Sequence, residues 1–195
     1  MNVKKKTEYQ PNMSDELNNV YQSLRKNKKS EWNRILPFNE LFVDRWEKAK
    51  FAKFKTGSSI YDSSLIFGTV NVGKETWVGP FVILDGSGGK LSIGSFCSIS
   101  SGVQIYTHSS VKWALTKGKS KYEKGNVTIG DGCYIGPNAI ISMNSKIGKC
   151  SVIGAQSFVN SNIPANSIAI GNPAKVVGKI KTNGKNVKFE YYDKK

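Results

Sequence analysis

The chain has 195 residues, of which 38% are hydrophobic and 22% charged, and this length suits one substantial domain with an appendage. No apolar run approaches the roughly 18 residues of a membrane span, and no apolar segment follows the basic N-terminus as in a secretory signal, so we expect a cytoplasmic protein. A formal net charge of +15 at pH 7 predicts an anionic partner, which leaves nucleic acid, anionic lipid and a phosphorylated small molecule open.

Residues 1–56 are predicted to form a helical cap. Ser14-Asp15-Glu16 is typical of a helix start, and the apolar residues after it recur at helical spacing: Leu17, Val20, Tyr21 and Leu24. Pro37 interrupts this helix, and a second helix is predicted over residues 38–50, with one side formed by Leu41, Phe42, Arg45 and Trp46. We expect the cap to cover the open end of the strands that follow, because unpaired strand edges invite association.

From residue 57 to about residue 180 an aliphatic side chain recurs every six positions, with two breaks. It stands at Ile60, Ile66, Val72, Val78, Leu84, Ile93, Ile99, Ile105, Ile129, Ile135, Ile141, Ile147, Ile153 and Val159. The fifth position of each unit is small or β-branched, and glycine, which permits tight turns, often follows the aliphatic residue. A helix would repeat near 3.6 positions and a strand at two, so a period of six indicates short strands joined by tight bends. Such strands stack into a parallel β-helix, in which each coil pairs with its neighbours.

The first break is the glycine-rich stretch 85–90, and the second is an extended loop near residues 106–126. The second break contains the only histidine of the chain, His108, and five lysines: Lys112, Lys117, Lys119, Lys121 and Lys124. Functional residues concentrate on loops that a rigid scaffold positions, so a site is predicted here. Residues 181–195 form a basic tail, for which one short strand or helix is predicted.

Units such as Ile147-Gly148-Lys149-Cys150-Ser151-Val152 resemble the hexapeptide-repeat (isoleucine-patch) acyltransferase superfamily, over about residues 57–180. The chain is most similar to the branch associated with surface-glycan biosynthesis, such as that of lipopolysaccharide or capsule. The resemblance implies a left-handed β-helix with three units to a coil, and a homotrimer with active sites between subunits. It also implies direct transfer of an acetyl group from acetyl-CoA to a sugar hydroxyl, with no metal and no covalent enzyme intermediate.

His108 matches the catalytic histidine of this family, and the resemblance implies that it removes the acceptor proton as general base. A loop histidine without a role is the plain alternative. The family often has aspartate directly after the histidine, where this chain has Ser109, so a backbone carbonyl or a carboxylate such as Asp85 or Glu123 is left to orient the imidazole. Asp85 is equally open as a turn residue or as a contact of the acceptor. Further acceptor contacts are expected from Tyr106, Trp113 and Tyr122.

The resemblance also implies a coenzyme A site. The residues that match its segments are Tyr134, Gly136, Pro137, Gly154, Ala155, Asn160, Ser161, Asn172, Pro173 and Lys175. The chain departs from the family pattern at three places: Tyr134 replaces a tryptophan, Gly102 an asparagine, and Asn160-Ser161 the common Thr-Lys. Lys175, with Lys179 or Lys181, is expected to contact the phosphates of coenzyme A, and a solvated tail lysine is the alternative.

The same residues leave two other functions open. The alternatives are an N-acetyltransferase that acts on a nucleotide-linked amino sugar, and a non-catalytic β-helix scaffold. A zinc enzyme of the carbonic-anhydrase type needs three histidines, and the chain has one. No nucleic-acid-binding motif accompanies the basic charge, and membrane contact is limited to peripheral association. Cys97 and Cys133 fall at inward positions and Cys150 at an outward one, so none is expected to be a nucleophile.

Overall fold

The computed structural model describes residues 12–192, which form two compact units that divide after Asp44. The first unit holds α1 (Met13–Trp32) and α2 (Phe38–Phe42), which contact each other through the rings of Tyr21 and Phe38. The side chain of Asn12 caps α1 by accepting a hydrogen bond from the Asp15 amide (3.1 Å), so the helix begins slightly before the predicted start. α1, which is described throughout, has no buried residue.

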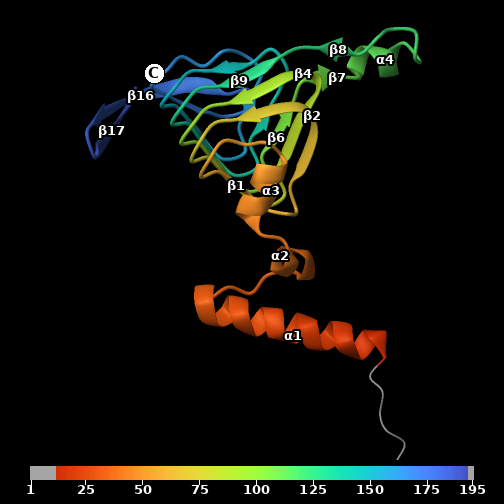
Figure 1. Ribbon diagram of the computed structural model, residues 1–195. Coiled ribbons are helices and arrows are strands. Elements are labelled where there is room, and N and C mark those ends of the chain that lie inside the picture. The colour runs from red at the N-terminus through yellow and green to blue at the C-terminus, as the bar shows by residue number, and fades with distance from the viewer. Residues whose placement is uncertain (1–11, 193–195) are drawn as a thin grey trace, which may run out of the picture. The chain divides into compact units, whose positions relative to one another are not determined.

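The second predicted helix is two helices in the structure. α2 ends at Phe42, the backbone is extended at Val43, and α3 (Arg45–Phe51) follows in the second unit. α3 contacts β1 (Ser59–Ile60) and buries Ala49 in the core (Figure 1). The Lys48 ammonium donates hydrogen bonds to carbonyl groups of the first coil, namely those of Tyr61, Asp62 and Ser64. α3 therefore covers the first coil. The wider cap over residues 1–56 stays a prediction, and its residues 1–11 lie outside the described part of the chain.

The second unit is a β-helix with three faces of parallel strands (Figure 1). The first face contains β1, β3 (Trp77–Val78), β5 (Ser98–Ile99), β10 (Tyr134–Ile135), β13 (Val152–Ile153) and β15 (Ser167–Ile170). The second face contains the first halves of β2 (Leu65–Val72) and β4 (Ile83–Ile93), then β6 (Gln104–Tyr106), β11 (Ile140–Ile141) and β14 (Phe158–Val159). The third face contains the second halves of β2 and β4, then β9 (Val127–Ile129) and β12 (Lys146–Ile147). The predicted parallel β-helix is confirmed, and its left-handed sense stays a prediction.

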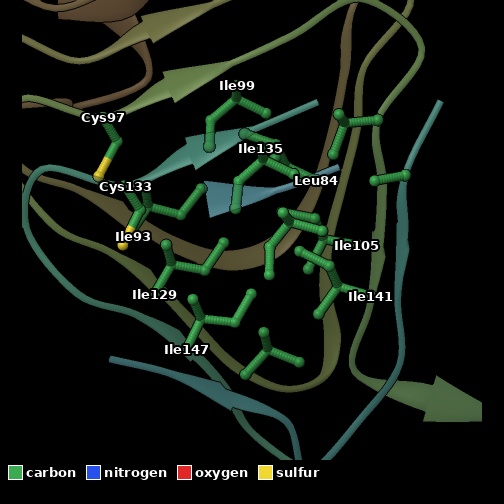
Figure 2. Close-up of a cluster of buried hydrophobic side chains, with 14 of the residues drawn as sticks. Leu84, Ile93, Cys97, Ile99, Ile105, Ile129, Cys133, Ile135, Ile141 and Ile147 are labelled. Atoms are coloured by element: carbon green, nitrogen blue, oxygen red, sulfur yellow. The ribbon is translucent and has the colours of Figure 1, made fainter. Parts of the chain in front are cut away.

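The core is a stack of aliphatic side chains that point inward from the three faces (Figure 2). The repeat positions fill it, and the fully buried ones include Ile60, Val78, Leu84, Ile99, Ile105, Ile129, Ile135, Ile141, Ile147 and Ile153. Small residues at the fifth position satisfy backbone groups at the corners. The Ser64 hydroxyl, for example, donates to the Gly79 carbonyl (2.7 Å) and accepts from the Val82 amide (3.0 Å).

The glycines that follow the aliphatic residues serve close stacking of the coils. A side chain at Gly136 would place its Cβ 2.6 Å from the backbone nitrogen of Ala155 in the next coil. These glycines do not have positive φ. Positive φ occurs instead three residues after the aliphatic position, as at Asn138 (56°) and Gly102 (72°). The interpretation of the first glycine as a turn-permitting residue is therefore wrong, and Gly102 occupies the corner position that asparagine fills in other coils.

The second break and the C-terminal segment both contain paired strands. In the break, β7 (His108–Ser109) and β8 (Glu123–Lys124) form an antiparallel pair, with α4 (Val111–Leu115) between them. At the C-terminus, β16 (Lys175–Asn183) pairs with β15 and with β17 (Asn186–Tyr191). A single short element after residue 180 is therefore wrong, because β16 begins earlier and β17 returns along it. No helix within residues 12–192 is long and apolar enough to cross a membrane.

Candidate functional site

The two breaks of the repeat lie at one corner of neighbouring coils, between the second and third faces. β4 pairs with β6 before this corner, with Asp85 opposite Tyr106, and with β9 after it, with Leu91 opposite Val127. The glycine-rich stretch inside β4 therefore lies beside the loop that joins β6 to β9. We name residues 85–90 and 106–126 the histidine corner.

The imidazole of His108 faces the carboxylate of Asp85. His108 Nδ1 lies 3.2 Å from Asp85 Oδ2, and the two side chains are 29% and 7% exposed. The other carboxylate oxygen, Oδ1, accepts hydrogen bonds from the Ser87 amide (2.8 Å) and hydroxyl (2.5 Å). Both oxygens of Asp85 are therefore used within the chain, which holds the carboxylate in one orientation beside the imidazole.

This contact determines which nitrogen of His108 carries the proton. A carboxylate at Nδ1 favours a proton there, which leaves the lone pair on Nε2. Ser87 Oγ also lies 3.4 Å from Nδ1, and no residue within 12–192 forms a hydrogen bond with Nε2. An imidazole held in this way can accept a proton from a hydroxyl through Nε2, and the carboxylate then stabilises the positive charge.

Thr107 joins the two halves of the histidine corner. Its side chain is completely buried, and its hydroxyl donates to the Asp85 carbonyl (2.8 Å) and accepts from the amides of Gly88 (3.0 Å) and Gly89 (3.1 Å). Gly88 lies so close that an added Cβ would come 2.4 Å from the Cβ of His108. The glycine-rich stretch therefore has to lack side chains at this point for His108 to keep its position.

The loop after His108 folds back over the imidazole. The ring of Tyr122 stacks on that of His108, with 6.0 Å between the ring centroids and 7° between the planes. Trp113 meets Tyr122 edge to face at 5.7 Å. β7 and β8 pair with His108 opposite Lys124, and the Gly125 amide donates to the Thr107 carbonyl (2.9 Å). The aromatic residues of the loop thus form a wall beside the histidine.

Tyr106 and Glu123, two further polar residues of the histidine corner, each interact with a residue other than His108. The Tyr106 hydroxyl donates to Gln104 Oε1 (2.8 Å), and burial, with a smaller contribution from the charge of Asp85, raises the pKa of this phenol. Tyr106 therefore stays neutral. Glu123 forms an ion pair with Lys112 (2.7 Å), so of the two carboxylates considered for orienting His108, Asp85 is the one in place.

Of the four residues expected around the acceptor, Asp85 and Tyr122 contact His108 directly. Trp113 contacts Tyr122, and Tyr106 lies opposite Asp85 in the pairing of β6 with β4. The burial of Asp85 argues against its direct contact with an acceptor within its own subunit. Sequence reasoning missed Ser87 and Thr107, which hold the Asp85 carboxylate and the backbone behind it. The sequence did contain a sign that the two breaks lie together. With three units to a coil, Leu84 and Ile105 fall on the same face, so the break that follows each of them must lie at the same corner.

The residues expected at the coenzyme A site lie at two corners. Gly136-Pro137, Gly154-Ala155 and Gly171-Asn172-Pro173 stack between the first and second faces, where backbone hydrogen bonds join successive coils. Tyr134 precedes this corner on the first face and is 43% exposed. Asn160 and Ser161 instead follow β14, at the same corner as His108 but further along the helix axis.

The lysines expected near the phosphates differ in their surroundings. Lys175 and Lys179 are exposed on β16. Lys181 forms an ion pair with Glu190 on β17 (2.9 Å), and hydrogen bonds from Lys181 and Lys188 hold the pKa of that carboxyl below its usual value. Of the two supporting lysines, the structure therefore leaves Lys179 without a carboxylate partner among the described residues.

The cysteines pack in the coils as their positions predict. Cys97 and Cys133 are buried in neighbouring coils (Figure 2), and their thiols donate to the carbonyls of Gly130 and Gly148, each at 3.2 Å. A hydrogen bond with Cys97, together with burial, raises the pKa of Cys133 far above its usual value. Within residues 12–192, no group of three or more histidine, cysteine, aspartate or glutamate side chains is placed to hold a metal ion.

Comparisons with known proteins agree with the repeat. The bacterial transferase hexapeptide family (six repeats) matches residues 126–161. Chloramphenicol acetyltransferase of Klebsiella aerogenes is 32% identical over 108 residues, which are 46% of this chain and 51% of that protein. The matched segments cover 30–64% of the length of these curated relatives.

Solved structures match over a larger share of the chain. A hexapeptide-repeat-containing acetyltransferase from Vibrio cholerae is 25% identical, with a TM-score of 0.63 over 84% of this chain and 92% of that chain, and it has also been solved in complex with acetyl coenzyme A. A maltose O-acetyltransferase from Clostridium difficile is 26% identical, with a TM-score of 0.57 over 86% of this chain and 90% of that chain. Together with the repeat, these matches show that the chain is similar to the hexapeptide-repeat acetyltransferases and contains their repeat over residues 126–161.

Proposed function

We propose that the protein transfers an acetyl group from acetyl-CoA to a sugar hydroxyl, with His108 as general base. The contact between His108 Nδ1 and the buried Asp85 carboxylate carries this proposal, because it leaves Nε2 free to accept a proton. The name of the maltose O-acetyltransferase supports a sugar hydroxyl as the acceptor, and the Vibrio cholerae complex supports acetyl-CoA as the donor. We further propose that the acceptor belongs to surface-glycan biosynthesis.

In the proposed reaction, His108 Nε2 removes the proton of the acceptor hydroxyl as its oxygen attacks the thioester carbonyl. The C–S bond then breaks, and the imidazolium returns the proton to the departing thiolate of coenzyme A. Asp85 stabilises the imidazolium between these steps and holds the ring in place. Ser87 and Thr107 are positioning residues, because they fix Asp85 and the backbone around it.

The donor site is proposed along the corner between the first and second faces. Three of the matching segments stack there, which provides a continuous row of backbone groups for an extended arm of coenzyme A. Lys175 and Lys179 are exposed on β16, and their two cations are proposed to contact the phosphates. The active form is proposed to be a homotrimer, in which this corner of one subunit faces the histidine corner of its neighbour. Three cysteines without a disulfide favour the cytoplasm as the compartment.

A thiol-release assay with acetyl-CoA and a panel of sugars, amino sugars, nucleotide sugars and chloramphenicol tests the proposal. His108→Ala should lower kcat by about a hundred- to ten-thousandfold while acetyl-CoA still binds, since general-base assistance is of that size. Mass spectrometry of the product distinguishes an O-acetyl from an N-acetyl group. Transfer by His108→Ala at nearly the wild-type rate would contradict the mechanism, and saturable binding of acetyl-CoA without transfer to any acceptor would favour a scaffold.

A further inference from the structure

The loop of the histidine corner places positive charge on the same side as the imidazole. β7 and β8 form a two-stranded ribbon in which His108 lies opposite Lys124 and Ser109 opposite Glu123. Residues directly opposite in an antiparallel pair project from the same side of the ribbon, with Cβ atoms about 5 Å apart. Lys124 and His108 therefore share one side, and Glu123 lies on the other.

The negative charge of the loop is neutralised on the side away from His108. Glu123 is the only acidic residue of residues 106–126, and Lys112 pairs with it at 2.7 Å. Lys119, Lys121 and Lys124 have no ion pair with any residue in the described part of the chain. The loop thus keeps several lysine charges available for a ligand that the chain itself does not supply.

These lysines line a hollow together with the aromatic residues beside His108. Lys119, Lys121 and Lys124 border it with Trp113 and Tyr122. Tyr122 stacks on the imidazole and is 44% exposed, and Trp113 is 45% exposed. Both β7 and β8 contact β4, which carries Asp85, and the ribbon and α4 project beyond the coils (Figure 1). The hollow next to His108 thus combines the apolar faces of two aromatic rings with three lysine ammonium groups.

We propose that the acceptor is an anionic sugar, whose phosphate or carboxylate is held by Lys124 with Lys119 and Lys121 while a hydroxyl of its ring approaches His108. Trp113 and Tyr122 supply the apolar surface against which the sugar ring lies. This proposal rests on the proposed acetyl transfer and adds the charge of the acceptor to it.

Four acceptors that share one hexose ring test the proposal: glucose, glucuronic acid, glucose 1-phosphate and uridine diphosphate glucose. Thiol release with acetyl-CoA gives kcat/KM for each, and calorimetry gives the affinity of each without turnover. At least one anionic sugar should exceed glucose by about tenfold in kcat/KM, as hydrogen bonds to charged groups allow. The best of the three anionic sugars identifies a carboxylate, a monophosphate or a diphosphate as the preferred group.

Lys124→Gln should lower the ratio of kcat/KM for the preferred anionic sugar to kcat/KM for glucose about tenfold, because the anionic group loses its partner. Lys117→Gln is the matched control, since it removes the same charge from the same loop and Lys117 does not line the hollow. The preference should also weaken at high salt. Equal use of glucose and the anionic sugars, or equal effects of Lys124→Gln and Lys117→Gln, would overturn the proposal.

The two proposals can fail separately. If no sugar releases thiol but the anionic sugars bind more tightly than glucose in a Lys124-dependent way, sugar acetylation is wrong and the anion site stands. If sugars are acetylated without regard to charge, acetyl transfer stands and the anion site is wrong. If neither transfer nor charge-dependent binding is seen, both are wrong.

Discussion

Replacement of Asp85 by asparagine tests which ring nitrogen of His108 carries the proton. The asparagine oxygen can keep the hydrogen bonds from the Ser87 amide (2.8 Å) and hydroxyl (2.5 Å). Its NH₂ group must then face His108 Nδ1, which Asp85 Oδ2 approaches to 3.2 Å. An NH₂ donor at Nδ1 favours the tautomer with the proton on Nε2, and that tautomer cannot accept a proton from a hydroxyl.

The expected fall in kcat follows from two losses, the hydrogen bond between Asp85 and the imidazole and the general-base assistance of His108. The loss of a hydrogen bond to a charged group costs about 1.5–3 kcal/mol, and loss of general-base assistance lowers a rate by about 10²–10⁴. Asp85→Asn should therefore lower kcat for acetyl transfer by at least about tenfold and approach His108→Ala. The KM for acetyl-CoA should not change, because the Asp85 side chain is only 7% exposed. Initial rates of thiol release at saturating acceptor measure both quantities.

Ser87→Ala is the matched control for Asp85→Asn. It removes the hydroxyl bond to Oδ1 and the longer contact of the hydroxyl with Nδ1 (3.4 Å), but it leaves the carboxylate beside Nδ1, so kcat should fall by less than about tenfold. A kcat for Asp85→Asn within about threefold of the wild type would refute the assigned tautomer, since a general base in the wrong tautomer cannot work at that rate.

Three further changes test the corner and the donor site. Thr107→Val leaves the partly buried amides of Gly88 and Gly89 without their acceptor and should cost about 1 kcal/mol of unfolding free energy in urea. An unchanged urea midpoint would show that these two hydrogen bonds contribute little. Gly88→Ala should lower kcat about a hundredfold, because the alanine Cβ would come 2.4 Å from the Cβ of His108 and displace the imidazole. Full activity of this variant would show that the backbone adapts to the added methyl group. Lys175→Glu should raise the KM for acetyl-CoA at low salt, and the increase should be smaller at high salt. The control is Lys185→Glu, which lies in the turn between β16 and β17. An unchanged KM for Lys175→Glu would exclude Lys175 from the coenzyme A site.

The repeat made the β-helix predictable, because a period of six leaves few ways to bury one aliphatic side chain per unit. Ile99, Ile135 and Ile153 lie in register on the first face as the spacing requires. The role of the glycines was not predictable from spacing alone. A glycine required by a turn and one required by a neighbouring coil look the same in a sequence, and only the 2.6 Å approach at Gly136 separates them.

The sequence predicted which types of residue lie near His108 but not how they are arranged. It indicated both Asp85 and Glu123 as possible partners of the imidazole. The structure shows that Glu123, on the strand paired with β7, forms its ion pair with Lys112. The break between α2 and α3 and the hairpin of β16 and β17 also escaped prediction. Both depend on contacts with the coils or with another strand, which local spacing does not record.

The arrangement of the histidine corner separates the proposed chemistry from the choice of acceptor. Asp85 is held by the pairing of β4 with β6, which is complete before the loop leaves the coils, and Ser87 and Thr107 each donate a hydrogen bond to Asp85. The chain then re-enters the stack through the pairing of β4 with β9, so the register after the loop does not depend on what the loop contains. Changes within residues 110–122 can therefore alter which acceptor binds while the carboxylate and the imidazole stay in contact. We therefore propose that the lysines and aromatic residues of the loop determine which acceptor binds, and that Asp85 and His108 determine the reaction.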